Sequence, residues 1–70
     1  MTTSLVRFSE ERGYCVRLEY FQASLDNYFR AEIVKDGILY AVKNVKTREE
    51  GLQAYDWFVN HLDLYVNLPF

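Results

Sequence analysis

The side chains that could hold a metal ion or form a catalytic group are few and lie far apart in the sequence. His61 is the only histidine, and its acidic neighbours in sequence are Asp56 and Asp63. A zinc site needs several nitrogen or thiolate ligands, and Cys15 is the only cysteine. We therefore expect no metal site and no cofactor.

Covalent and acid–base catalysis are not indicated by the sequence either. A Ser-His or Cys-His pair would have to join His61 to a serine or to Cys15, and no motif spacing indicates such a pair. The acidic pairs that begin at Glu10 and Glu49 stand where turns and helix starts use carboxylates. The three glycines are isolated, so no phosphate-binding loop occurs. We expect a protein that is not an enzyme.

The composition is typical of one small folded domain spanning residues 1–70. Half of the 70 residues are hydrophobic and 17% are aromatic, which is too apolar for a disordered chain. A chain of this length builds one core at most. The net charge is -2 and the sequence pI is about 5.2, opposite in sign to a typical DNA-binding domain. This balance favours a protein partner over nucleic acid.

We expect a cytoplasmic protein. A single cysteine excludes an internal disulfide and suits a reducing compartment. No apolar run approaches the roughly 18 residues that a membrane helix needs, and the opening MTTSLVRFSEER lacks the pattern of a signal peptide. These features predict no membrane association.

Alternating apolar and polar residues predict an antiparallel sheet. The pair Asp36-Gly37 separates two apolar runs and favours a two-residue type I′ turn, so we expect strands near 28–35 and 38–46. Residues 14–21 alternate in the same way, and the polar QASLDN joins them to the next strand. We also expect a weaker fourth strand at 4–8, closed by a turn at Gly13.

The turns predict the pairing of residues across these strands. The expected pairs are Lys35–Ile38, Ile33–Tyr40, Ala31–Val42, Phe21–Tyr28, Tyr20–Phe29, Leu18–Ala31 and Val16–Ile33. This register collects the apolar side chains on one face. The opposite face is then expected to hold Arg17 opposite Glu32, Glu19 opposite Arg30, Lys43 beside Arg30, and Phe21, Tyr28, Val34, Leu39 and Val45. We interpret this face either as a solvated surface that neutralises its own charge or as a binding face.

A helix is predicted from Thr47 to about residue 62. Thr47 followed three residues later by Glu50 is a capping-box pattern. Helical spacing gathers Gly51, Leu52, Tyr55, Phe58, Val59 and Leu62 on one side, which would cover the sheet. Gly51 then permits a close approach of the helix to a strand.

The same helical spacing turns Trp57 away from the sheet, together with Gln53, Asn60, His61 and Leu64. Either the tail LDLYVNLPF folds back over Trp57, or Trp57 is a binding hot spot or part of a homodimer interface. The residues expected to contact a partner are Trp57, His61, Leu64, Tyr28 and Phe21. The predicted fold class is α+β, an antiparallel sheet of three to four strands with one α-helix across one face.

Residues from about 28 to 59 are similar to the AP2 DNA-binding domains of plant transcription factors and related mobile-element domains. The matching positions are Ala31, Glu32, Ile33, Thr47, Glu49, Glu50, Ala54, Tyr55 and Asp56. The resemblance implies three strands followed by one helix and a DNA-binding or accessory role. That family reads DNA through Arg and Trp on exposed strands, where this chain has Val34 and Phe29. The basic strand residues that remain are Arg17, Arg30 and Lys43.

In size, acidity and layout the chain also looks like the small phage-encoded inhibitors of host machinery, including some anti-CRISPR proteins. That similarity implies an accessory protein of a phage or mobile element, which binds and modulates a host protein or a protein–nucleic acid complex. Two hypotheses for the function follow from these features. The charge favours a non-enzymatic interaction protein, and the alternative is the AP2-like DNA-binding or accessory domain.

Overall fold

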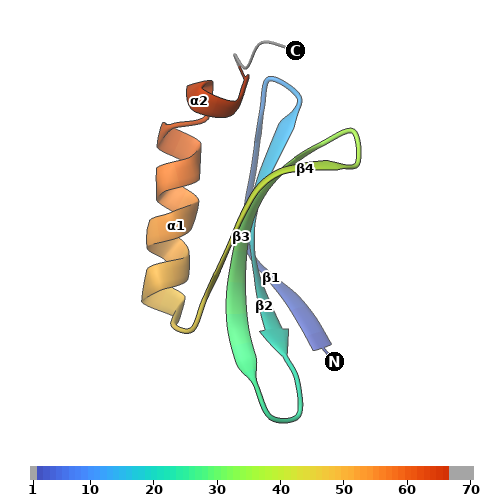
Figure 1. The fold of residues 1–70 in the computed structure, drawn as a ribbon, viewed down its shortest axis with the longest axis vertical. Coiled ribbons are helices and arrows are strands. Elements are labelled where there is room, and N and C mark those ends of the chain that lie inside the picture. The colour runs from blue at the N-terminus through green and yellow to red at the C-terminus, as the bar shows by residue number, and fades with distance from the viewer. Residues whose placement is uncertain (1, 67–70) are drawn as a thin grey trace.

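The computed structural model describes residues 2–66 and shows a four-stranded antiparallel sheet with a helix across one face (Figure 1). The strands follow one another in the order β1-β2-β3-β4. The elements are β1 (Thr2–Glu11), β2 (Tyr14–Gln22), β3 (Asn27–Lys35), β4 (Ile38–Val45), α1 (Arg48–Asn60) and α2 (Asp63–Val66). The predicted α+β class is confirmed, and the weak strand expected at 4–8 is real and longer than expected.

Two tight turns close the outer hairpins. Asp36 and Gly37 join β3 to β4 with φ values of 52° and 78°, as a type I′ turn requires. Arg12 and Gly13 join β1 to β2 with φ values of 55° and 81°. Aspartate tolerates a positive φ more readily than arginine does, which is why the first hairpin had the weaker sequence signal.

The predicted register between β2 and β3 is confirmed along its whole length. Val16 lies opposite Ile33, and Leu18 lies opposite Ala31. These side chains form the centre of the core, where Leu18, Ala31 and Ile33 are 0% exposed. The loop that joins the two strands closes with a hydrogen bond of 3.1 Å from the Ala23 amide to the Asp26 carbonyl.

The predicted register between β3 and β4 is wrong beyond the turn. Lys35 lies opposite Ile38 as expected, but Ile33 lies opposite Ala41 instead of Tyr40. Tyr40 is therefore the extra residue of a β-bulge. Its ring packs edge-on against that of Tyr14, with ring centroids 5.3 Å apart.

The bulge exchanges the faces of the residues that follow it in β4. Ala31 lies opposite Lys43 and not opposite Val42, and Phe29 lies opposite Val45. Lys43 and Val45 therefore point to the helix side, where Val45 packs against the core, although both were expected on the other face. Val42, expected in the core, is 46% exposed on the face away from the helix.

The helix α1 begins where the sequence predicts. The Glu50 amide donates to the Thr47 hydroxyl at 3.1 Å, and that hydroxyl donates to the Glu50 carboxylate at 2.9 Å. The buried side of α1 consists of Gly51, Ala54, Tyr55 and Phe58. This is the predicted stripe with Ala54 added, while Leu52 and Val59 are only half-buried.

Gly51 allows α1 to lie close to the sheet, as predicted. A Cβ atom on Gly51 would come within 3.0 Å of Leu18 Cδ1 and 3.1 Å of Phe29 Cβ. Both neighbours lie in the core, where Leu18 is 0% exposed and Phe29 is 7% exposed. A methyl group at position 51 would therefore push the helix away from β2 and β3.

Gly51→Ala should lower the free energy of unfolding. Alanine in a solvated helix position is favoured over glycine by about 1 kcal/mol, but overpacking a closed core costs roughly 1–3 kcal/mol. We expect a net loss on the order of 1 kcal/mol in urea unfolding. Gln53→Ala on the exposed side of α1 is the control and should change little. Stabilisation by Gly51→Ala would show that Leu18 and Phe29 leave enough room for a methyl group at position 51.

The bulge can be tested with a matched pair of substitutions in β4. Val45→Thr places a hydroxyl against the core and should cost about 1 kcal/mol. Val42→Thr places the same group on an exposed surface and should change stability by less than about 0.5 kcal/mol. Both are measured by urea unfolding of dilute protein. The opposite order of the two losses would support the unbulged register.

Candidate functional site

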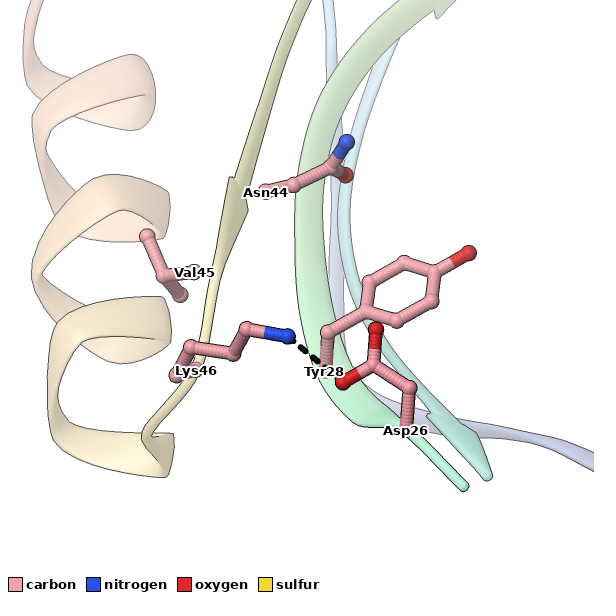
Figure 2. A pocket seen from close by; sticks show the side chains of 5 residues that line it. All are labelled: Asp26, Tyr28, Asn44, Val45 and Lys46. Carbon is pink, nitrogen blue, oxygen red and sulfur yellow. Dashed lines mark hydrogen bonds and ion pairs between the residues drawn. The ribbon is translucent and has the colours of Figure 1, made fainter. Parts of the chain in front are cut away.

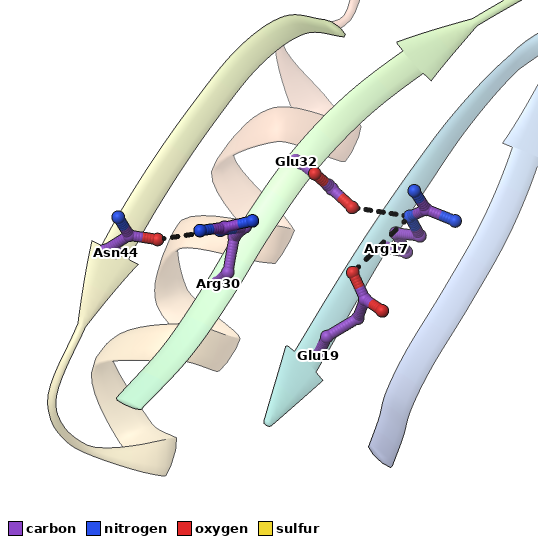
Figure 3. Close-up of polar contacts among 5 residues, drawn as sticks. All are labelled: Arg17, Glu19, Arg30, Glu32 and Asn44. Atoms are coloured by element: carbon purple, nitrogen blue, oxygen red, sulfur yellow. Dashed lines mark hydrogen bonds and ion pairs between the residues drawn. The ribbon is translucent and has the colours of Figure 1, made fainter. Parts of the chain in front are cut away.

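The face of the sheet opposite α1 is not covered by any element among residues 2–66 (Figures 1 and 3). Four large apolar side chains are about half exposed on it or more: Leu5 at 61%, Phe8 at 50%, Leu39 at 50% and Val42 at 46%. We call this surface the uncovered sheet face and define it by Leu5, Phe8, Arg17, Glu19, Phe21, Tyr28, Arg30, Glu32, Leu39, Val42 and Asn44. Large exposed apolar patches on small soluble domains commonly mark binding surfaces.

An ion-pair cluster occupies the centre of the uncovered sheet face (Figure 3). Arg17 Nε donates to Glu32 Oε1 at 2.6 Å, which confirms the predicted pair, and lies 3.6 Å from Glu19 Oε1. Glu32 is 5% exposed. Burial, followed by a hydrogen bond with the Glu32 carboxyl, raises the pKa of Glu19, while Arg17 opposes that shift. The Glu32 hydrogen bond raises the pKa of Arg17, which therefore stays charged.

Phe21 and Tyr28, two of the residues predicted to contact a partner, form a stack at one end of the uncovered sheet face. Their rings are parallel within 4° and their centroids are 5.0 Å apart. The Arg30 guanidinium lies 4.8 Å from the Phe21 centroid, and Arg30 Nε donates to Asn44 Oδ1 at 3.0 Å. Arg30 is thus held by the aromatic rings and by Asn44. Glu19, which lies opposite Arg30 in the register, forms an ion pair with Arg17 instead.

A hollow of about 230 Å³ beside this stack is lined by Asp26, Tyr28, Asn44, Val45 and Lys46 (Figure 2). Lys46 Nζ lies 2.6 Å from Asp26 Oδ1, and both side chains are mainly exposed. An exposed ion pair of this kind contributes little to stability. The hollow has no buried polar group that could orient a ligand.

Trp57, the main predicted contact residue, is 44% exposed on the outer side of α1. Its indole stacks on the His61 ring at a centroid distance of 4.2 Å and an angle of 14°. His61 Nδ1 lies 2.8 Å from the Trp57 carbonyl oxygen, so the two rings are tied through the backbone of one helical turn. Leu64, in α2, is 58% exposed. We call Trp57, His61 and Leu64 the Trp57 surface.

The sequence also allows the C-terminal tail to cover Trp57, and the structure describes the first part of that tail. Tyr65 of α2 meets the indole edge-on at a centroid distance of 6.5 Å. The remaining tail residues, 67–70, lie outside the described residues. One edge of the indole is therefore supported by α2, while much of the ring stays exposed.

A groove of about 260 Å³ runs beside Trp57, between α1 and β4, and is lined by Lys43, Ala54, Trp57 and Phe58. It adjoins a second hollow of about 240 Å³, lined by Lys43, Val45, Glu50, Gln53, Ala54 and Trp57. The position of Lys43 in this groove was not predicted, because the sequence shows no signal for the bulge at Tyr40. The structure thus adds a charged group to the surroundings of Trp57.

The residues of the nucleic-acid alternative do not form one patch. Arg17 is paired with Glu32, Arg30 is held by the aromatic stack, and Lys43 lies on the opposite face of the sheet. Phosphate binding needs several cations on one surface. Arg17, Arg30 and Lys43 therefore do not reproduce the DNA-reading face that the AP2 resemblance implies.

Among residues 2–66, no three His, Cys, Asp or Glu side chains gather as a metal-binding group would require. The Cys15 thiol is half-buried on β2, and burial raises its pKa, which makes it less nucleophilic at neutral pH. In the same described range, no helix has the length and apolar character needed to span a membrane.

Comparison of the chain with protein-family models, with curated proteins and with solved structures found no match. The similarities to AP2 domains and to small phage-encoded inhibitors remain predictions.

The ion-pair cluster predicts a specific dependence of stability on pH. Because the pKa of Glu19 is raised in the folded protein, the folded state holds this proton more tightly than the unfolded state. Its contribution is present below the ordinary glutamate pKa and is lost as the pH rises through the raised value. Glu19→Gln should therefore raise the thermal midpoint at about pH 7 and reduce the gain in stability on acidification to about pH 5. Glu10→Gln, at an exposed position of β1, controls for the loss of one charge.

Proposed function

We propose that this chain is a non-enzymatic protein-binding domain that contacts its partner through the Trp57 surface. The observation that carries the proposal is the 44% exposure of Trp57, beside a groove and with its ring already fixed. Tryptophan is enriched among the few residues that supply most of the energy of protein interfaces. A fixed aromatic side chain loses little conformational entropy on binding.

Three contacts support this geometry. The His61 ring supports one face of the indole, Tyr65 meets its edge, and the amide of His61, the C-cap of α1, donates to the Trp57 carbonyl. Within residues 2–66 no acidic side chain forms an ion pair with Lys43 in the neighbouring groove. The partner that fits is a protein surface with an apolar side chain for the groove and a carboxylate for Lys43.

We further propose that the domain acts as an accessory protein of the phage or mobile-element type, which modulates a host protein or a protein–nucleic acid complex. The support for this role is its small size, its net charge of -2 and the layout of strands and helix. The acidic balance and the separation of Arg17, Arg30 and Lys43 favour a protein contact over direct binding to duplex DNA.

Trp57→Ala should weaken partner binding while the fold stays intact. Truncation of a hot-spot tryptophan typically costs about 2 kcal/mol, or roughly thirtyfold in affinity. The measurement is affinity capture from a lysate of the cells that encode the protein, with and without nuclease, alongside a thermal melt. Leu25→Ala is the control, because Leu25 is 98% exposed on the loop between β2 and β3.

Two outcomes would contradict the proposal. Unfolding of the Trp57→Ala variant, together with quencher-protected fluorescence of the wild-type protein, would assign Trp57 to the core. Capture that disappears with nuclease and survives Trp57→Ala would favour the nucleic-acid alternative.

A further inference from the structure

Four ionised side chains at the centre of the uncovered sheet face form a checkerboard. Arg17 and Glu32 lie opposite each other, and in the next row of the same face Glu19 lies opposite Arg30. Each of the two central strands therefore carries one arginine and one glutamate, two residues apart, in alternating order. The four charges sum to zero.

The outer strands continue both rows with mainly apolar groups. Phe8 of β1 and Val42 of β4 flank the row of Arg17 and Glu32. Leu5 of β1 flanks the row of Glu19 and Arg30, with Asn44 at its other end. Exposed apolar groups thus stand on both sides of a charged centre.

We propose that a second copy of this chain packs face to face on the uncovered sheet face and forms a two-fold dimer. Rotation by 180° about an axis in the plane of the sheet, running either along or across the strands, carries every position of the checkerboard onto one of opposite charge. With the axis across the strands, Arg17 of one copy meets Glu19 of the other; with the axis along the strands, it meets Glu32. A two-fold interface uses the same patch twice, so its patch must be complementary to itself.

Part of the charged centre is already buried in a single copy. Glu32 is 5% exposed within a single copy and is bonded to Arg17. No buried side-chain nitrogen or oxygen atom among the described residues lacks a hydrogen-bond partner. Glu32 is therefore removed from water when the monomer folds, while the Arg17 side chain is still 39% exposed. A facing copy would bury the rest of Arg17 against one of its own glutamates, and it would bury the apolar groups of Leu5, Phe8 and Val42 as well.

The area of the face suits such a dimer. The strands have 8 to 10 residues, and strand spacings of about 4.8 Å with rises of about 3.3 Å per residue give a face of about 500 Å² in each copy. The two copies together would bury on the order of 1,000 Å², which is at the lower end for specific interfaces and is consistent with micromolar association. The four central charges cancel, so the centre of the face offers little electrostatic attraction to a highly charged partner.

The dimer is independent of the proposed function, because α1 lies on the other side of the sheet (Figure 1). Each dimer would keep two Trp57 surfaces open. Binding of the partner and dimerisation can therefore be separated by mutation.

Sedimentation of the full chain over a range of concentrations tests the proposal. We expect a monomer–dimer equilibrium in the wild-type protein. Phe8→Glu and Val42→Lys should each weaken it at least about tenfold, because a charge would be buried in the apolar flank of the interface. Each new charge lies beside an opposite one in its own copy, Arg17 or Glu32, so the monomer fold should tolerate it.

Leu25→Glu and Trp57→Ala are the matched controls and should leave the equilibrium unchanged, with circular dichroism to confirm folding. A wild-type protein that stays monomeric at about 100 µM, far above a micromolar dissociation constant, would overturn the proposal. So would a dimer that persists in both Phe8→Glu and Val42→Lys. A dimer that is lost in Trp57→Ala and kept in Phe8→Glu would show that the interface lies on the helix side, and it would overturn the proposal.

Discussion

Tyr40, the extra residue in β4, controls how the rest of the surface is arranged. Side chains alternate between the faces of a strand, so one unpaired residue exchanges the faces of all the residues that follow. Beyond Tyr40, Lys43 turns to the helix side and Val42 joins the uncovered sheet face. The ring contact between Tyr40 and Tyr14 holds the bulge against the core. The uncovered sheet face and the groove beside the Trp57 surface therefore both take part of their composition from this one irregularity.

The two surfaces differ in chemistry because a single helix covers only one face of the sheet. The Trp57 surface is small and aromatic, and its rings are fixed by mutual stacking and by the end of α1. It suits one deep contact with an unlike protein. The uncovered sheet face is broad and has no net charge at its centre, where Arg17 and Glu32 are already paired. It suits another flat surface with the same alternation, so the two faces can serve different partners at once.

Local signals predicted most of the elements, because their causes lie within a few residues. The Asp36-Gly37 turn needs only two residues that accept positive φ, and the start of α1 needs only the exchange of hydrogen bonds between Thr47 and Glu50. Helical periodicity alone predicts that Trp57 points away from the sheet. Of the candidate sites, the Trp57 surface could thus be predicted, while the groove beside it could not, since it requires the position of β4 relative to α1.

The sequence by itself determined β2, β3, β4, the start of α1 and the pairing of β2 with β3, because a two-residue period and a buried face leave one register for those two strands. Only the tertiary structure decided the pairing of β4. In the bulged register the Tyr40 ring packs against Tyr14, on a strand distant in sequence. That contact exists only once β2, β3 and β4 lie side by side, so no local pattern could reveal that Lys43 joins Trp57.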